Sequence, residues 1–112
     1  MGRNRTKDLL QGALELLVLR LLRSEPLNGW DIMHRLQLVS GDVLSVTAGS
    51  LYPALHRLEL KRWLQAEWRP SDTGREAKFY KLSRRGKAQL ERETAGWDQM
   101  ARAIYAVLRT VE

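Results

Sequence analysis

The order of apolar periods along the chain is the feature that most constrains its fold. Apolar residues recur every three or four positions from Lys7 to Arg23, and again in two shorter stretches that end near Val39 and Lys61. This spacing is typical of helices that bury one face. The period then changes in an aromatic-rich segment and returns to helical spacing after Ser83. We therefore expect three helices, a β-hairpin and a last helix, in that order.

Prolines and N-cap residues indicate where the helices begin and end. Pro26 ends the first helix, because proline cannot continue the hydrogen-bond ladder. Pro53 lies beyond the first turn of the third helix, so its missing N–H predicts a local irregularity there. The last helix is expected to continue to about Val111. Three side chains are suited to cap the second, third and last helices: Asn28, Thr47 and Ser83.

The hairpin is predicted to be positively charged. Aromatic residues are frequent in Trp63–Arg69 and Ala77–Leu82, and the turn-forming stretch Pro70–Glu76 separates these segments. The chain has a net charge of +6, and residues 69–87 alone hold seven basic and two acidic residues. Concentrated positive charge attracts polyanions, of which nucleic acid is the commonest for a cytosolic protein. An ordinary solvated basic face is the alternative interpretation.

Three helices followed by a basic hairpin predict a winged helix-turn-helix. In this fold the third helix enters the major groove of DNA, and the wing reaches the phosphates or the neighbouring minor groove. The expected fold class is mainly α with a small two-stranded β-hairpin and a C-terminal dimerisation helix. Residues 1–83 would form an N-terminal arm and the DNA-binding domain, and residues 84–112 the dimerisation helix, within one compact unit.

The last helix carries an apolar seam with steps of four and three residues, which resembles a heptad pattern. So wide an apolar face needs a partner, and we expect a homodimer. The candidate dimerisation residues are Leu90, Trp97, Ala101, Ile104 and Leu108.

Several stretches of the sequence resemble the PadR family of bacterial transcriptional regulators. They are Leu9–Gly12, Pro26–Trp30, Gly49–Glu59 and Ala77–Ser83 with Gly86. The single helix after the wing is similar to the short-C-terminus branch of that family. The resemblance implies a homodimer, commonly a repressor, that binds double-stranded operator DNA and joins mainly through the C-terminal helix, with the first helix packing against that helix of the partner. Trp30 stands where a tyrosine is more usual, a change that we interpret as packing.

The DNA-binding candidates combine donors to phosphate with one residue that can read guanine. Serine, tyrosine and arginine donate to phosphate oxygens, and arginine can also form two hydrogen bonds with guanine. The third helix would otherwise present an ordinary solvated face, the wing an ordinary soluble turn and the arm a floppy charged terminus. Arg57 could instead pair with an acid near Glu59 or elsewhere. The candidates are Lys7, Ser50, Tyr52, Pro53, His56, Arg57, Arg75 and Lys78.

Trp97 has two interpretations. Two copies that face each other across a dimer would form walls for a small aromatic effector, as some relatives in this branch use. A buried dimer anchor is the alternative. Trp63 and Trp68 are expected to pack the wing against the core.

The composition also limits the function classes. The chain has no cysteine and two histidines, and it shows no paired-carboxylate, phosphate-loop or nucleophile motif, so we expect no enzyme activity, no metal and no cofactor. The apolar run Leu9–Leu22 is interrupted by polar residues and is shorter than the roughly 20 residues of a membrane span. We expect a cytoplasmic protein without a membrane partner. A winged-helix protein-interaction or dimerisation module without specific DNA binding is the alternative function.

Overall fold

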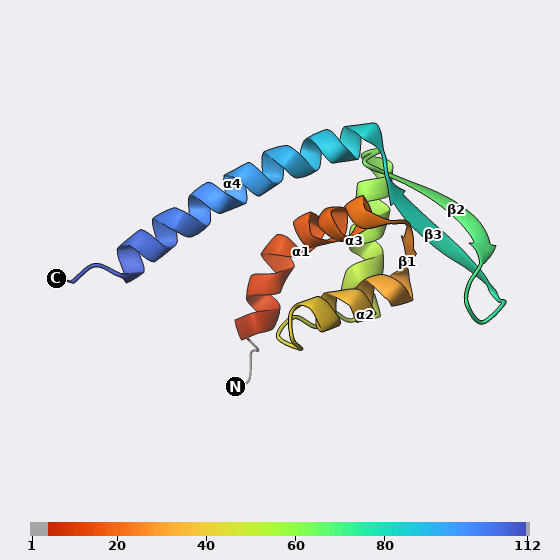
Figure 1. Cartoon of the computed structure of the whole chain (residues 1–112), viewed down its shortest axis with the longest axis horizontal. Helices are drawn as coiled ribbons and strands as arrows, with labels where there is room; N and C mark the ends of the chain where they lie inside the picture. The colour runs from red at the N-terminus through yellow and green to blue at the C-terminus, as the bar shows by residue number, and fades with distance from the viewer. Residues whose placement is uncertain (1–4, 112) are drawn as a thin grey trace.

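The computed structural model describes the backbone of residues 5–111 and the side chains of residue 10 and residues 13–111. It contains helices and a small antiparallel sheet in the expected order, and it confirms the predicted winged helix-turn-helix (Figure 1). The helices are α1 (Arg5–Ser24), α2 (Gly29–Val39), α3 (Ala48–Leu60) and α4 (Arg84–Leu108), and the strands are β1 (Leu27–Asn28), β2 (Leu64–Pro70) and β3 (Glu76–Leu82). Within the described residues, no helix is both long and apolar enough to cross a membrane.

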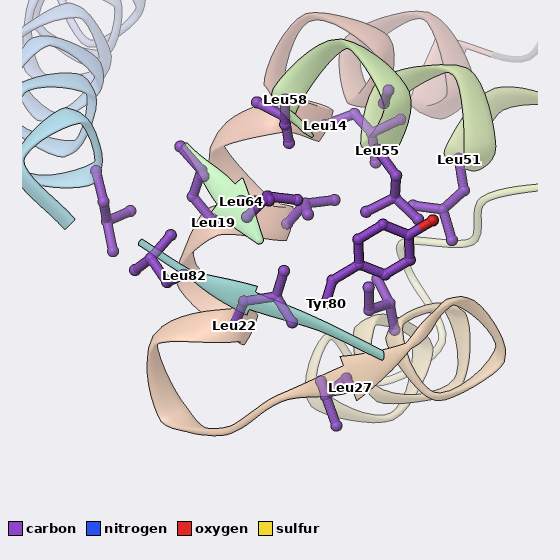
Figure 2. Close-up of a cluster of buried hydrophobic side chains, with 14 residues drawn as sticks. Leu14, Leu19, Leu22, Leu27, Leu51, Leu55, Leu58, Leu64, Tyr80 and Leu82 are labelled. Atoms are coloured by element: carbon purple, nitrogen blue, oxygen red, sulfur yellow. The ribbon is translucent and has the colours of Figure 1, made fainter. Parts of the chain in front are cut away.

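The core lies between α1, α3 and the sheet (Figure 2). Helix α3 contributes a fully buried stripe, and α1 buries Val18 and Leu19 almost completely. Leu19 falls outside the stripe that helical spacing selects in α1, yet it is buried because α1 contacts α2, α3, α4 and β3. The buried residues of α3 are Leu51, Ala54, Leu55 and Leu58.

Both caps expected for α2 and α3 are present. The side chain of Asn28 accepts a hydrogen bond from the backbone N–H of Asp31 at 2.8 Å, and Thr47 accepts one from that of Ser50 at 3.3 Å. The irregularity expected at Pro53 is not seen, since α3 continues through this residue. The carbonyl that a donor at this position would have reached belongs to Gly49, which is exposed, so water can satisfy it.

The predicted hairpin is confirmed, and a third strand joins it. Strands β2 and β3 pair from Leu64↔Leu82 to Pro70↔Glu76, while β1 pairs with β3 on the other side through Leu27↔Tyr80. The sheet order is therefore β1-β3-β2. The sequence predicted only the two strands of the hairpin. It did not predict β1, because two residues are too few to show the alternation of a strand.

The start of α4 is fixed to the turn between α3 and β2. The hydroxyl of Ser83 accepts a hydrogen bond from the backbone N–H of Gly86 at 3.0 Å, and it lies 2.8 Å from the carbonyl oxygen of Arg62 and 2.9 Å from that of Trp63. Helix α4 ends at Leu108, three residues before the expected end. In Figure 1 its C-terminal half extends beyond the other elements, on the side of the molecule opposite the wing.

The two described glycines of α4 should respond in opposite directions to alanine. A Cβ at Gly86 would lie 2.1 Å from the carbonyl oxygen of Trp63, whereas a Cβ at Gly96 would meet nothing within 4 Å. Gly86→Ala should lower the free energy of unfolding by about 2 kcal/mol or more. Gly96→Ala should raise it by up to about 1 kcal/mol, because alanine is the better helix former. Urea denaturation followed by circular dichroism measures both, and a Gly86→Ala protein as stable as the original would refute the tight junction.

Candidate nucleic-acid interface

The outer face of α3 carries most of its predicted site residues. Tyr52, Pro53 and His56 are exposed on the side opposite the buried leucines. Ser50 lies at the edge of this face, is half-buried, and has its hydroxyl 3.4 Å from that of Thr47. The face therefore presents a hydroxyl, a phenol and an imidazole to solvent, all of which can hydrogen-bond phosphate oxygens.

Tyr52 is held in place by α2. A Cβ added to Gly29, the first residue of α2, would lie 2.3 Å from the Tyr52 hydroxyl oxygen, so a larger residue here would displace the Tyr52 ring. The ring nevertheless remains 45% exposed. Tyr52 thus links the N-terminus of α2 to α3 and still offers its surface to a ligand.

Arg57 lies apart from the rest of this face because it pairs with α1. Its Nε lies 2.8 Å from Oε2 of Glu15, and Nζ of Lys61 lies 3.6 Å from Oε1 of the same carboxylate. The acidic partner of Arg57, which the sequence did not identify, is therefore Glu15 and not an acid near Glu59. This contact reduces the case for Arg57 as a base-reading residue, since the guanidinium would have to exchange a partner on binding.

The two wing residues predicted from the sequence occupy different surroundings. Arg75 is exposed at the tip, where Ser71 N–H donates to the Arg75 carbonyl at 2.7 Å. Lys78 is half-buried, and its Nζ donates to Oε1 of Glu59 on α3 at 3.1 Å. This hydrogen bond raises the pKa of Lys78 above its ordinary value despite the opposing effect of burial, so the ammonium stays charged at neutral pH. Lys78 ties the wing to α3.

Arg69 is a wing cation that the sequence analysis did not single out. Its guanidinium stacks on the ring of Phe79 at 4.2 Å, on the sheet face that points away from the core. Strand alternation could have indicated this contact, because Arg69 and Phe79 both fall on the outward-facing set of their strands. The side chain of Lys7, the remaining predicted contact, lies outside the described part of the chain.

The seam on α4 divides into a buried start and an exposed remainder. Leu90 is 2% exposed and belongs to the chain's own core, so it does not lie on the free surface expected of a dimerisation residue. Ala101 is half-buried, and Trp97, Ile104 and Leu108 are exposed. Further large apolar residues of α4 widen the exposed surface: Met100, Tyr105 and Val107.

Trp97 also borders a pocket between α4 and α1. The pocket has a volume of about 290 Å³ and is lined by Leu44, Trp97 and four residues of α1, namely Leu10, Ala13, Leu16 and Leu17. Its walls are almost wholly apolar. Trp97 is 49% exposed, so one chain alone leaves about half of this residue open to solvent.

Of the three other tryptophans, one has its expected role and two do not. Trp63 packs against the core as expected. Trp68 is 67% exposed, so its expected role in core packing is wrong. Trp30 is 60% exposed and stacks on His34 with ring centroids 3.9 Å apart, which makes it a surface residue instead of a packing one. Among the described residues, no three His, Asp or Glu side chains gather in a way that could hold a metal ion.

Comparison with known proteins identifies the family. The sequence model of the PadR family, described as the Transcriptional regulator PadR-like family, matches residues 18–92. A PadR-like transcription factor from Bacteroides fragilis is 31% identical, with 94% of this chain and 99% of that chain covered and a TM-score of 0.72. A PadR family regulator from Eggerthella lenta is 29% identical over 93% and 88% of the two chains, with a TM-score of 0.78.

The fold is shared at lower identity as well. A PadR-like transcriptional regulator from Bacillus cereus is 24% identical, covers 93% of this chain and 99% of its own, and superposes with a TM-score of 0.80. A family match over most of the chain and the shared winged-helix architecture agree. This chain belongs to the PadR-like family of transcriptional regulators.

Proposed function

We propose that this protein is a sequence-specific DNA-binding regulator that acts as a homodimer in the cytoplasm and represses transcription in response to a ligand. The observation that carries the proposal is the pairing of an exposed polar face on α3 with exposed cations on the wing, Arg69, Arg75 and Lys81, in a member of this family. Family members are transcriptional regulators and not enzymes.

The polar face of α3 would enter the major groove. Tyr52, His56 and Ser50 supply hydrogen-bond donors for phosphates at its edges, while Pro53 gives a compact apolar contact. Arg57 could reach a base or phosphate only after it leaves Glu15. Sequence would thus be read by few side chains, and the phosphate contacts would fix the register.

The wing would supply the salt-dependent part of the affinity. Arg75 at the tip is free to reach a phosphate or the minor groove, and Lys7 would add a contact from the N-terminal arm. Lys78 would contribute less than its charge suggests, because Glu59 already neutralises it.

The seam on α4 would join two chains through Trp97, Ala101, Ile104 and Leu108. In one chain, Trp97, Ile104 and Leu108 leave large apolar surfaces in water, and Ala101 is half-buried. In a dimer the pocket beside Trp97 would be closed by the partner, and its apolar walls suit a small aromatic effector. Trp97 would otherwise serve as a buried anchor of the dimer.

The test of the proposal is a mobility-shift titration against DNA from upstream of the protein's own gene, with scrambled DNA as competitor. The expected result is a complex that survives the competitor. Equal and weak binding to both DNAs would contradict specific regulation through this DNA and favour a winged-helix interaction module.

Two charge variants test whether the wing contacts phosphates. Both are measured on a DNA fragment that the wild-type protein binds in the presence of competitor. Arg75→Ala should reduce the slope of log Kd against log salt by about one, because one phosphate contact is lost. Glu59→Gln should steepen the slope by up to about one, because Lys78 is released toward the phosphates. An unchanged slope in either variant would remove that lysine or arginine from the interface, and circular dichroism checks that both variants fold.

A charge on the seam should separate the proposed dimer. Ile104→Asp would place an unpaired carboxylate in an apolar interface, at a cost of several kcal/mol in association free energy. Gln99→Asp is the matched control, since Gln99 lies on the opposite side of α4 and is exposed. Sedimentation equilibrium should show a monomer or a much weaker dimer only for Ile104→Asp. A dimer of undiminished affinity in that variant would refute the assignment of the seam as the dimer interface.

A further inference from the structure

A groove beneath the wing has no role in the proposed DNA binding or in the proposed dimer. It has a volume of about 690 Å³ and lies between the wing, the N-terminus of α2 and Tyr52 of α3. This volume falls within the range of small-molecule sites, about 300–1,000 Å³. The groove is distinct from the pocket beside Trp97, with which it shares no lining residue.

Aromatic side chains stand around the groove with much of their surface in water. Trp68 of β2, Trp30 of α2 and Tyr52 of α3 line it and are 67%, 60% and 45% exposed. Trp68 falls on the same face of β2 as the buried Leu64, but it lies farther along the strand, where the core no longer covers it. Aromatic surface exposed on three elements around one hollow is suited to a flat aromatic ligand.

The charges around the groove favour a cation. Asp31, Asp72 and Glu76 line it, and among the described ion pairs none involves these carboxylates. Of the two basic residues in the lining, Lys78 is neutralised by Glu59. Arg75 is thus the one lining cation without a described ion pair, against three carboxylates. A cation over the electron-rich face of tryptophan gains further electrostatic attraction.

We infer that this groove binds a planar aromatic cation, such as a quaternised fused-ring nitrogen heterocycle. If the proposed DNA binding holds, on which this second step rests, the ligand competes with DNA, because Tyr52 and Arg75 line the groove and also belong to the proposed DNA face. The groove would then be a regulatory site within each winged helix, separate from any effector pocket between two chains.

The site is tested first without DNA. Calorimetric titration at pH 8 compares 1-methylquinolinium with two analogues of similar shape, neutral quinoline and anionic quinoline-4-carboxylate. The cation should saturate one site per chain below about 1 mM and bind about tenfold more tightly than the anion. Absence of saturable binding, or equal binding of all three compounds, would overturn the inference.

Two tryptophan variants locate the site. Trp68→Ala should weaken binding of 1-methylquinolinium about tenfold, because it removes one aromatic wall. Trp97→Phe, a conservative change at the other pocket, should leave the affinity unchanged. The reverse pattern would place the ligand beside α4 and overturn the assignment.

The competition step has its own readout. On DNA that the wild-type protein retains, 1-methylquinolinium should raise the apparent Kd for DNA, and the Trp68→Ala protein should lose this effect while its own DNA complex persists. Ligand binding at Trp68 with no change in the DNA affinity would overturn competition and leave the DNA-binding proposal intact. A protein that binds the ligand but no DNA would contradict the proposed function alone.

Discussion

Helix α1 contacts every other described helix and the central strand of the sheet. Val18 and Leu19 are fully enclosed, and the helix packs against α2, α3, α4 and β3. Burial of this kind is the main favourable term in folding. Because α1 supports α3 from behind, the outward direction of Tyr52 and His56 is a consequence of leucine packing on the opposite side. The position of the candidate DNA face therefore depends on the core.

Polar contacts then fix the angles between the elements that the core brings together. Glu15 joins α1 to Arg57 and Lys61 of α3, and Glu59 joins α3 to Lys78 of the wing. Ser83 ties the start of α4 to the turn between α3 and β2. Since these acids neutralise basic residues of α3 and the wing, less positive charge is free for DNA than the number of basic residues implies.

Much of this arrangement could be predicted from the sequence, because periodicity and capping are local. The helices, their caps at Asn28, Thr47 and Ser83, and the hairpin all follow from residues near one another in the chain. Contacts between distant residues could not be predicted. Glu15 and Arg57 are 42 positions apart, and no local pattern shows that Leu90 closes the core instead of continuing the exposed seam. The exposure of Trp68 likewise depends on how far along β2 the core reaches, since Leu64 on the same face of the strand is buried.

In the proposed dimer, two copies of α3 and the wing bind one DNA duplex symmetrically. Hydroxyl-radical footprinting of the protein on a specifically bound fragment tests it most directly. Two equivalent protected regions, related by a two-fold axis and centred about one helical turn apart or a multiple of it, are the predicted result. A single asymmetric region, or weak protection along the whole fragment, would contradict the account.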